Sequence, residues 1–256
     1  MRSYSNTYIF VFSAIMVIIV AAILSVAAMT LQPFQKKNVE INKKQNILTS
    51  VNIESTAKDA EALYEKYILE SFTISSKGEI NNEVDAFNID MKKELAKPIE
   101  KQNLPIFISS LNDSKQYIIP VYGKGLWGPI WGYVALGDDL STIYGANFAH
   151  KGETPGLGAE IDTKDFQIKF FGKQIFNEEG QFVSISILKG GAADPNSKYE
   201  IDGISGGTIT SNGVDDMLKD CLSSYESYLK SIKQLTPEMD IENVSEVVSE
   251  ESQVNN

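Results

Sequence analysis

The sequence has almost none of the residues that build disulfides and metal centres. Cys221 and His150 are its only cysteine and histidine among 256 residues. A disulfide needs a pair of cysteines, a structural zinc site needs about four Cys or His ligands, and an iron–sulfur cluster needs about four thiolates. We therefore expect no metal site in this chain, and any redox chemistry requires an organic cofactor.

Basic residues are also scarce, with 23 Lys and Arg against 34 Asp and Glu. The resulting net charge of −11 argues against a nucleic-acid partner, because binding to phosphates needs a basic surface. Residues 235–256 contain six acidic residues and no basic one, which predicts a disordered acidic tail; an acidic docking tail is the alternative. The 43% of hydrophobic residues still suffices for a packed core.

Residues 8–29 are apolar except for Ser13 and Ser25, and no charged residue lies between Arg2 and Lys36. As a helix, these 22 residues would extend about 33 Å, enough to cross a hydrocarbon core of about 30 Å. A cleaved signal peptide is the alternative, but its apolar region usually spans only about 7–15 residues. The pattern predicts a retained membrane helix.

The charges around this helix leave its orientation open. The flank 1–7 contains Arg2, whereas several lysines follow the helix, at positions 36, 37, 43 and 44. The positive-inside rule would place the large domain in the cytoplasm, but the rule is weak for long translocated segments.

The rest of the chain reads as a polar stalk at 30–50 and one α+β domain at 51–234. Apolar spacing predicts helices at 57–68, 163–171 and 214–232. Short β-rich runs separated by turn residues predict strands at 105–109, 117–122, 133–136, 143–148 and 182–188. Cys221 lies in the apolar stripe of the last helix, which indicates a buried side chain and not a nucleophile.

Three segments contain more glycine than ordinary loops need, and the first is 122–132, YGKGLWGPIWG. Its glycines and its proline interrupt regular structure around Trp127 and Trp131. Either both tryptophans fill the core, or the bend presents an aromatic ring to a flat ligand.

The second segment is 150–158, HKGETPGLG. Its Pro155-Gly156 pair favours a turn with positive φ at the glycine. A lone His150 favours a hydrogen-bonded structural role over metal binding. The run from Glu153 to Leu157 offers backbone amides and one apolar side chain, which would suit a planar heterocycle.

The third segment is 202–214, DGISGGTITSNGV, which leads directly into the last predicted helix. Gly206 and Gly207 permit close backbone approach, and a helix start supplies free N–H groups and a positive dipole end. The segment therefore predicts a phosphate cradle. The alternative is an ordinary turn followed by a Ser or Thr helix cap.

These three segments, in this order behind one membrane helix, resemble the C subunit of the Na⁺-translocating NADH:quinone oxidoreductase from Tyr8 to about Ile232. The flavin-attachment motif of that family is Asp, two variable residues, Ser or Thr, Gly, Ala, Thr. Residues 202–208, DGISGGT, match it with Gly207 in place of Ala. The resemblance implies a mixed or antiparallel sheet with flanking helices, forming an extracytoplasmic FMN-binding domain.

The resemblance also implies FMN joined through its phosphate to Thr208, with Thr210 as second choice, by a dedicated flavin transferase. The remaining implied cofactor-binding residues are Trp127, Glu153, Thr154, Gly156, Leu157, Lys189, Ser205, Gly206 and Gly207. Trp127 and Leu157 would flank the ring, and Lys189 would lie near the phosphate or the ring. The chain would relay electrons from NADH towards ubiquinone inside a sodium-pumping complex, with sodium passing through other subunits.

Two alternatives stay open at this point. One is the G subunit of the related ferredoxin:NAD⁺ oxidoreductase, which shares the threonine motif. The other is a flavin-free, membrane-anchored scaffold in which residues 205–210 merely cap a helix.

Overall fold

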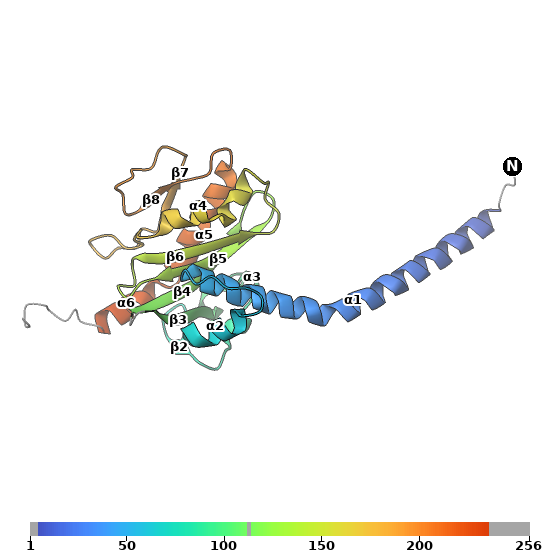
Figure 1. Cartoon of the computed structure of the whole chain (residues 1–256), viewed down its shortest axis with the longest axis horizontal. Coiled ribbons are helices and arrows are strands. Elements are labelled where there is room, and N and C mark those ends of the chain that lie inside the picture. Colours follow the sequence, from blue (N-terminus) through green and yellow to red (C-terminus); the bar gives the residue numbers. More distant parts are fainter. Residues whose placement is uncertain (1–4, 112–113, 236–256) are drawn as a thin grey trace, which may run out of the picture.

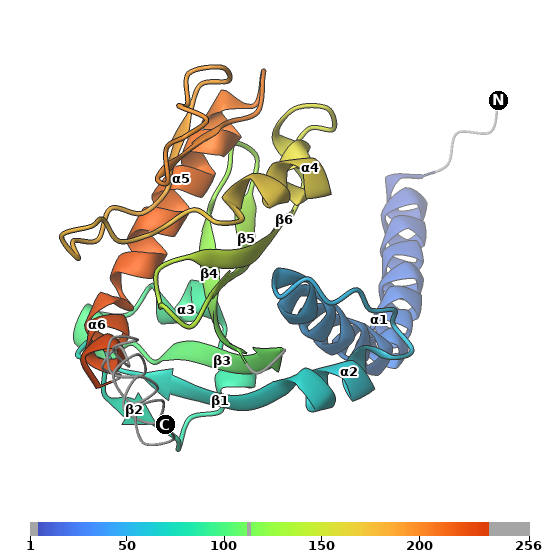
Figure 2. The same cartoon turned by 60° about the vertical axis from the view of Figure 1, so that its left-hand side comes forward.

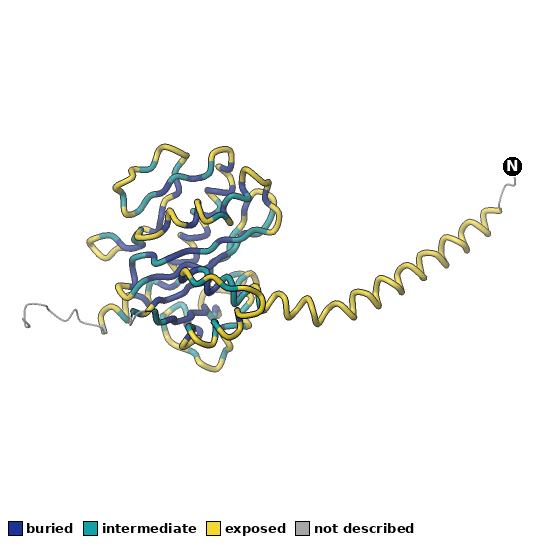
Figure 3. The backbone as a smooth tube through the Cα atoms, viewed as in Figure 1, coloured by how far each residue is buried: buried dark blue, intermediate teal, exposed yellow. Residues whose placement is uncertain are grey.

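A single long helix connects the apolar N-terminal region to the folded domain. The computed structural model describes residues 5–111 and 114–235, so most of the predicted tail and part of the N-terminal flank lie outside the described residues. Helix α1, Asn6–Ser50, is 45 residues long and projects far out of the domain (Figure 1). The described residues contain one helix long and apolar enough to cross a membrane, and none of its most apolar stretch is buried (Figure 3). It is a single-pass membrane anchor.

The segment expected to be a stalk continues this helix without interruption. Pro33 is accommodated inside α1, and the helix ends only at Ser50. Its last residues, Ile47, Leu48 and Ser50, are buried in the domain. The stalk therefore becomes part of the domain core before residue 51.

The domain is built on a six-stranded antiparallel sheet with the order β2-β1-β3-β4-β5-β6. The strands are β1 Ile68–Ile74, β2 Ile80–Asn81, β3 Leu104–Leu111, β4 Ser114–Lys124, β5 Pro129–Leu136 and β6 Ile143–His150. Four of the five predicted strands lie within β3 to β6. The prediction missed β1 and β2 and assigned Ile68, the first residue of β1, to the preceding helix.

The sheet is buried on both faces, because helices cover each side of it (Figure 2). Helix α5, Thr208–Ser223, packs on β4 on one face. The end of α1 packs on β5 and β6 on the other face, next to α2, Ala60–Tyr67. Alternation within the strands divides the core, so that Ile119 belongs to the α5 side and Ile118 to the α1 side.

Shorter elements complete the α5 side. They are the 3₁₀ helix η3, Gly158–Asp162, then α4, Lys164–Gln167, which passes into η4, Ile168–Phe170. A separate parallel pair, β7 Ser186–Leu188 and β8 Glu200–Asp202, precedes α5. The predicted helix 163–171 therefore consists of a short α-helix followed by a 3₁₀ turn. Of the predicted strand 182–188, only residues 186–188 pair with another strand.

The predicted C-terminal helix is broken in two. Helix α5 ends at Ser223 and α6 runs over Glu226–Leu235. At the break, the fully buried Tyr225 donates a hydrogen bond from its hydroxyl to the Pro105 carbonyl, 3.0 Å away. The apolar stripe is correct, and Cys221 lies in it as a buried thiol whose pKa is raised to about 11 by burial. Such a thiol stays protonated and is a poor nucleophile.

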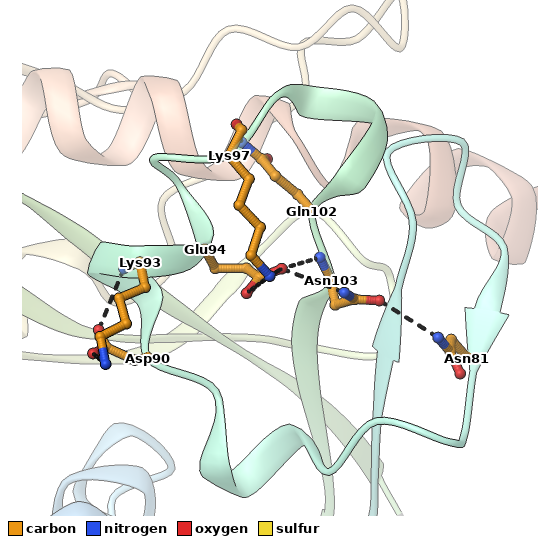
Figure 4. Close-up of polar contacts among 7 residues, drawn as sticks. All are labelled: Asn81, Asp90, Lys93, Glu94, Lys97, Gln102 and Asn103. Carbon is orange, nitrogen blue, oxygen red and sulfur yellow. Dashed lines mark hydrogen bonds and ion pairs between the residues drawn. The ribbon is translucent and has the colours of Figure 1, made fainter.

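The short helices η1 Ala86–Asn88, α3 Met91–Glu94 and η2 Ile99–Lys101 connect β2 to β3. A buried carboxylate holds this connection together (Figure 4). Glu94 accepts hydrogen bonds from the Lys97 Nζ at 2.6 and 2.8 Å and from the Asn103 backbone N–H at 2.7 Å. The lysine offsets the cost of burying the negative charge.

Tyr225→Phe should lower the free energy of unfolding by about 1–3 kcal/mol, because it leaves the buried Pro105 carbonyl without its donor. Urea unfolding of the detergent-solubilised chain measures this. Tyr199→Phe is the control, because Tyr199 is half-buried and its hydroxyl makes no hydrogen bond within the described residues. Equal stability of the two variants would contradict the role given to Tyr225.

Candidate functional site

The three glycine-rich segments meet at the end of the sheet where β4 turns into β5 and β6 ends. A shallow cavity of about 240 Å³ lies between them. Its lining residues are Leu126, Glu153, Thr154, Leu157, Gly158, Gly206, Gly207, Thr208, Ile209 and Thr210. Each of the three segments contributes to this lining, as expected if they form one site.

Helix α5 approaches β4 closely enough that two glycines are required at the contact. A Cβ on Gly213 would lie 2.4 Å from the Lys124 carbonyl oxygen. A Cβ on Gly123 would lie 2.7 Å from the Met217 Cβ. We call this contact the α5–β4 seam; it fixes the start of α5 beside the β4–β5 turn.

The β4–β5 turn presents its first tryptophan to solvent. Gly125 N–H bonds to the Gly128 carbonyl at 2.8 Å and closes the turn. The Trp127 residue is 69% exposed, so the interpretation that it fills the core is wrong. Trp131 is half-buried on β5 and lines a different cavity.

The loop after β6 is a tight turn supported by an acidic side chain. Leu157 N–H bonds to the Thr154 carbonyl at 3.1 Å, with Gly156 at a φ of 74°. The Gly156 N–H in turn bonds to the Glu160 Oε1 at 2.9 Å. The predicted turn with positive φ at Gly156 is confirmed.

His150 is a structural residue, as expected. Its Nδ1 accepts a hydrogen bond from the Glu153 backbone N–H at 3.0 Å, and its Nε2 lies 3.3 Å from Asp162 Oδ2. Both ring nitrogens are therefore engaged in holding the loop. The described residues contain no cluster of three or more His, Cys, Asp or Glu side chains suited to a metal.

The third segment brings a threonine to the surface at a helix start. Gly206 has a φ of 75°, and Gly207 precedes Thr208, the first residue of α5. No described side chain caps this end of α5, so the first N–H groups remain free for an anion. Thr208 is exposed, whereas Thr210 is 1% exposed.

The two candidate hydroxyls therefore differ in what they can do. The Thr210 Oγ1 donates a hydrogen bond to Glu153 Oε2 at 2.7 Å and is enclosed. Thr208 is exposed and is one of the residues that line the cavity. Of the two, Thr208 alone is accessible to a large reagent.

Asp202 organises the corner that follows β7. Its Oδ1 accepts hydrogen bonds from Ala192 N–H at 3.0 Å and Ala193 N–H at 3.1 Å. The Ala193 amide, with its neighbours, lowers the pKa of this carboxyl. The first residue of the motif thus supports the 189–193 corner.

The cavity lining differs in part from the residues singled out in the sequence. Trp127, Gly156, Lys189 and Ser205 are not among its lining residues. Lining residues not singled out are Leu126, Gly158 and Ile209, each next to a chosen residue or motif. Lys189 is exposed at the corner held by Asp202.

Larger cavities also lie elsewhere, and two of them, both in the folded domain, are lined by residues of neither the second nor the third segment. One of about 590 Å³ lies between α1 and the sheet, and one of about 410 Å³ lies between the end of α1 and α4. Cavity volume alone would favour the cavity of about 590 Å³ as the functional site. The convergence of backbone amides, a buried carboxylate and an exposed hydroxyl favours the smaller cavity.

Comparison with known proteins gives this site a family. The model of the FMN-binding domain matches residues 125–223, which include nearly all of the three segments. The C subunit of the Na(+)-translocating NADH-quinone reductase of Vibrio parahaemolyticus is 32% identical over 218 residues, covering 77% of this chain and 83% of the relative. The chain belongs to the C-subunit family of this reductase.

Solved structures agree with this assignment. The C subunit of the same reductase from Parabacteroides distasonis is 43% identical, with a TM-score of 0.72, covering 78% of this chain and 96% of that one. NqrC from Shewanella oneidensis, at 22% identity and a TM-score of 0.67, shares the fold. The C-subunit family is thereby favoured over the G subunit of the related ferredoxin:NAD⁺ oxidoreductase.

Gly158→Ala should destabilise the protein by about 1–3 kcal/mol. The new Cβ would lie 2.4 Å from Thr210 Oγ1 and 2.8 Å from Glu153 Oε2, so the buried hydrogen bond between them must shift. Gly152→Ala is the matched control, since its Cβ would meet no described atom within 4 Å. Urea unfolding in detergent should separate the two variants, and an unperturbed Gly158→Ala would refute the packing described.

Proposed function

We propose that this chain carries FMN joined through a phosphoester to Thr208 and relays electrons within a Na⁺-translocating NADH:quinone oxidoreductase. The observation that carries the proposal is the contrast between the exposed Thr208 and the buried, hydrogen-bonded Thr210. The product is a phosphodiester between Thr208 Oγ1 and FMN, a net gain of FMN minus one water. A flavin transferase would form this bond from an activated flavin nucleotide, whose leaving group departs from the phosphorus as the threonine oxygen attaches.

The start of α5 suits the phosphate. A phosphodiester on Thr208 keeps a negative charge beside free N–H groups and the positive end of the helix dipole, which contributes about 0.3–1 kcal/mol. Gly206 and Gly207 leave room for the group. A side chain at Gly206 would contact Leu157 Cδ2 at 2.7 Å.

The cavity suits one edge of a flat ring. Its volume of about 240 Å³ is below the roughly 300–1,000 Å³ of pockets that bury a small molecule. Trp127 and Leu157 would flank the ring, and Glu153 and Thr154 would line its pocket. A covalent bond retains a cofactor that such a shallow site holds only in part.

Bound FMN supplies electron transfer, for which the chain's own side chains have no chemistry. The protein positions the ring, shields one side of it and sets the charge around it. Lys189, which is exposed at the 189–193 corner, would place a cation near the phosphate or the ring and favour added electrons.

The relatives are named as subunits of a reductase, so we infer that other subunits of that complex are the partners. Between Arg2 and Lys36 the sequence contains no ionisable side chain other than the Tyr4 and Tyr8 phenols, so sodium would pass through other subunits. We infer that the domain lies on the extracytoplasmic side.

Thr208→Ala should abolish the covalent flavin while leaving the fold intact, because the residue is exposed. Mass spectrometry of the chain co-expressed with its flavin transferase should show FMN minus water on the wild type and not on the variant. In-gel flavin fluorescence after denaturation gives the same readout. Loss of flavin from Thr210→Ala but not from Thr208→Ala would move the attachment site.

Trp127→Ala should change the flavin absorption spectrum or its midpoint potential without releasing the flavin. The exposed indole would otherwise stack on one side of the ring and exclude water. Spectroelectrochemical titration of the purified chain measures both quantities. An unaltered spectrum and potential would remove Trp127 from the site.

A further inference from the structure

We propose that Glu153 is the positioning residue of this site: its buried carboxylate ties the three glycine-rich segments together and places a fixed negative charge in the cavity wall. The second half of this proposal rests on the proposed flavin; the first half concerns the protein alone.

The carboxylate is the common acceptor of the site. Glu153 is 5% exposed and belongs to the loop after β6. Its Oε1 accepts a hydrogen bond from the Trp127 backbone N–H at 2.9 Å, and its Oε2 accepts one from Thr210 Oγ1 at 2.7 Å. One side chain therefore connects the β4–β5 turn to the first turn of α5.

The same residue is anchored through its backbone. The Glu153 N–H bonds to His150 Nδ1 at 3.0 Å, so the carboxylate is positioned from the end of β6. The two side-chain bonds link residues 26 and 57 positions away from Glu153 in the sequence. Glu153 therefore supplies the side-chain hydrogen bonds that attach the Trp127 turn and α5 to the loop after β6.

Neighbouring glycines leave the space that the carboxylate occupies. A Cβ on Gly125 would lie 2.6 Å from Glu153 Oε1, and a Cβ on Gly158 would lie 2.8 Å from Oε2. Both glycines belong to the segments that Glu153 joins. Glycine is required at both positions because the backbone passes too close to the Glu153 carboxylate to leave room for a Cβ.

The carboxylate carries a full negative charge. Burial raises its pKa, but the hydrogen bonds from Thr210 and from the turn amides outweigh burial, and the pKa is lowered overall. No lysine or arginine among residues 5–111 and 114–235 forms an ion pair with it. The charge is compensated by neutral donors, and Glu153 lines the cavity.

A fixed anion beside a flavin opposes electron uptake, because uptake adds negative charge to the ring. Glu153 therefore holds the midpoint potential low, and Lys189 would act in the opposite sense. Thr210, whose enclosed hydroxyl is engaged by Glu153, acts as the partner that orients this carboxylate.

Glu153→Gln in the full-length, flavin-loaded chain tests the proposal. The midpoint potential should become more positive, and each tenfold gain in preference for the reduced form corresponds to about 30 mV for two electrons. Hydrogen exchange at the amides of residues 126–128, followed on flavin-free chain, should accelerate about tenfold because their charged acceptor is lost.

Glu94→Gln is the matched control. Glu94 is also a buried carboxylate, 4% exposed, but its hydrogen-bond partners Lys97 and Asn103 do not line the cavity. It should lower stability without changing the potential or the exchange at 126–128. If the two variants changed the midpoint potential and the exchange at 126–128 equally, Glu153 would be only a general stabilising residue, and the proposal would be overturned.

Thr210→Val separates the charge of Glu153 from the hydrogen bond that positions it. This variant also tests the proposal if Glu153→Gln does not fold. It removes the donor but keeps the carboxylate, so exchange at 126–128 should rise while the potential does not become more positive. Unchanged exchange, or a positive shift equal to that of Glu153→Gln, would contradict the proposal. If the wild type carries no flavin, the proposed function fails, but the exchange experiment still tests the positioning role.

Discussion

The α5–β4 seam is the constraint on which the site depends. Gly213 lets α5 approach the Lys124 carbonyl, and Gly123 receives the Met217 side chain. This contact brings Thr208 to the same edge of the sheet as the β4–β5 turn. The antiparallel ladder then brings in the second segment, 150–158, because Ile130 of β5 is paired with His150 at the end of β6. Any side chain at Gly213 would push the helix start away from the other two segments.

Much of the fold could be predicted because its signals are local. The apolar run of α1, the alternation in β3 to β6 and the apolar stripe from Val214 to Leu229 follow directly from periodicity. What could not be predicted depends on distant residues. The break between α5 and α6 occurs where Tyr225 reaches the Pro105 carbonyl, 120 positions away in the sequence. Strand β1 starts immediately after α2, without any turn residue to mark the change.

The site shows the same division. Glycine-rich motifs and a family resemblance pointed to the three segments, and these do form one cavity. The sequence pattern of residues 122–132 left open whether Trp127 is buried, because composition does not say which way a turn folds. In the structure Trp127 is exposed. The Glu153–Thr210 hydrogen bond joins residues 57 positions apart, so no local sequence pattern predicts it. That bond also distinguishes the two threonines, which are chemically equivalent in the sequence.

The uninterrupted helix between the apolar segment and the sheet has a geometric consequence. Asn38 and Val39 of α1 line the same cavity as Tyr122 and Trp131, so the helix reaches the domain near the edge that carries the site. From Met29 to Asn38 it rises about 14 Å, at about 1.5 Å and 100° per residue. The number of residues in this span therefore sets both the height of the site above the bilayer and the direction in which the site faces around the helix axis. Adding or deleting one residue there would swing the site about a quarter of a turn around the helix axis.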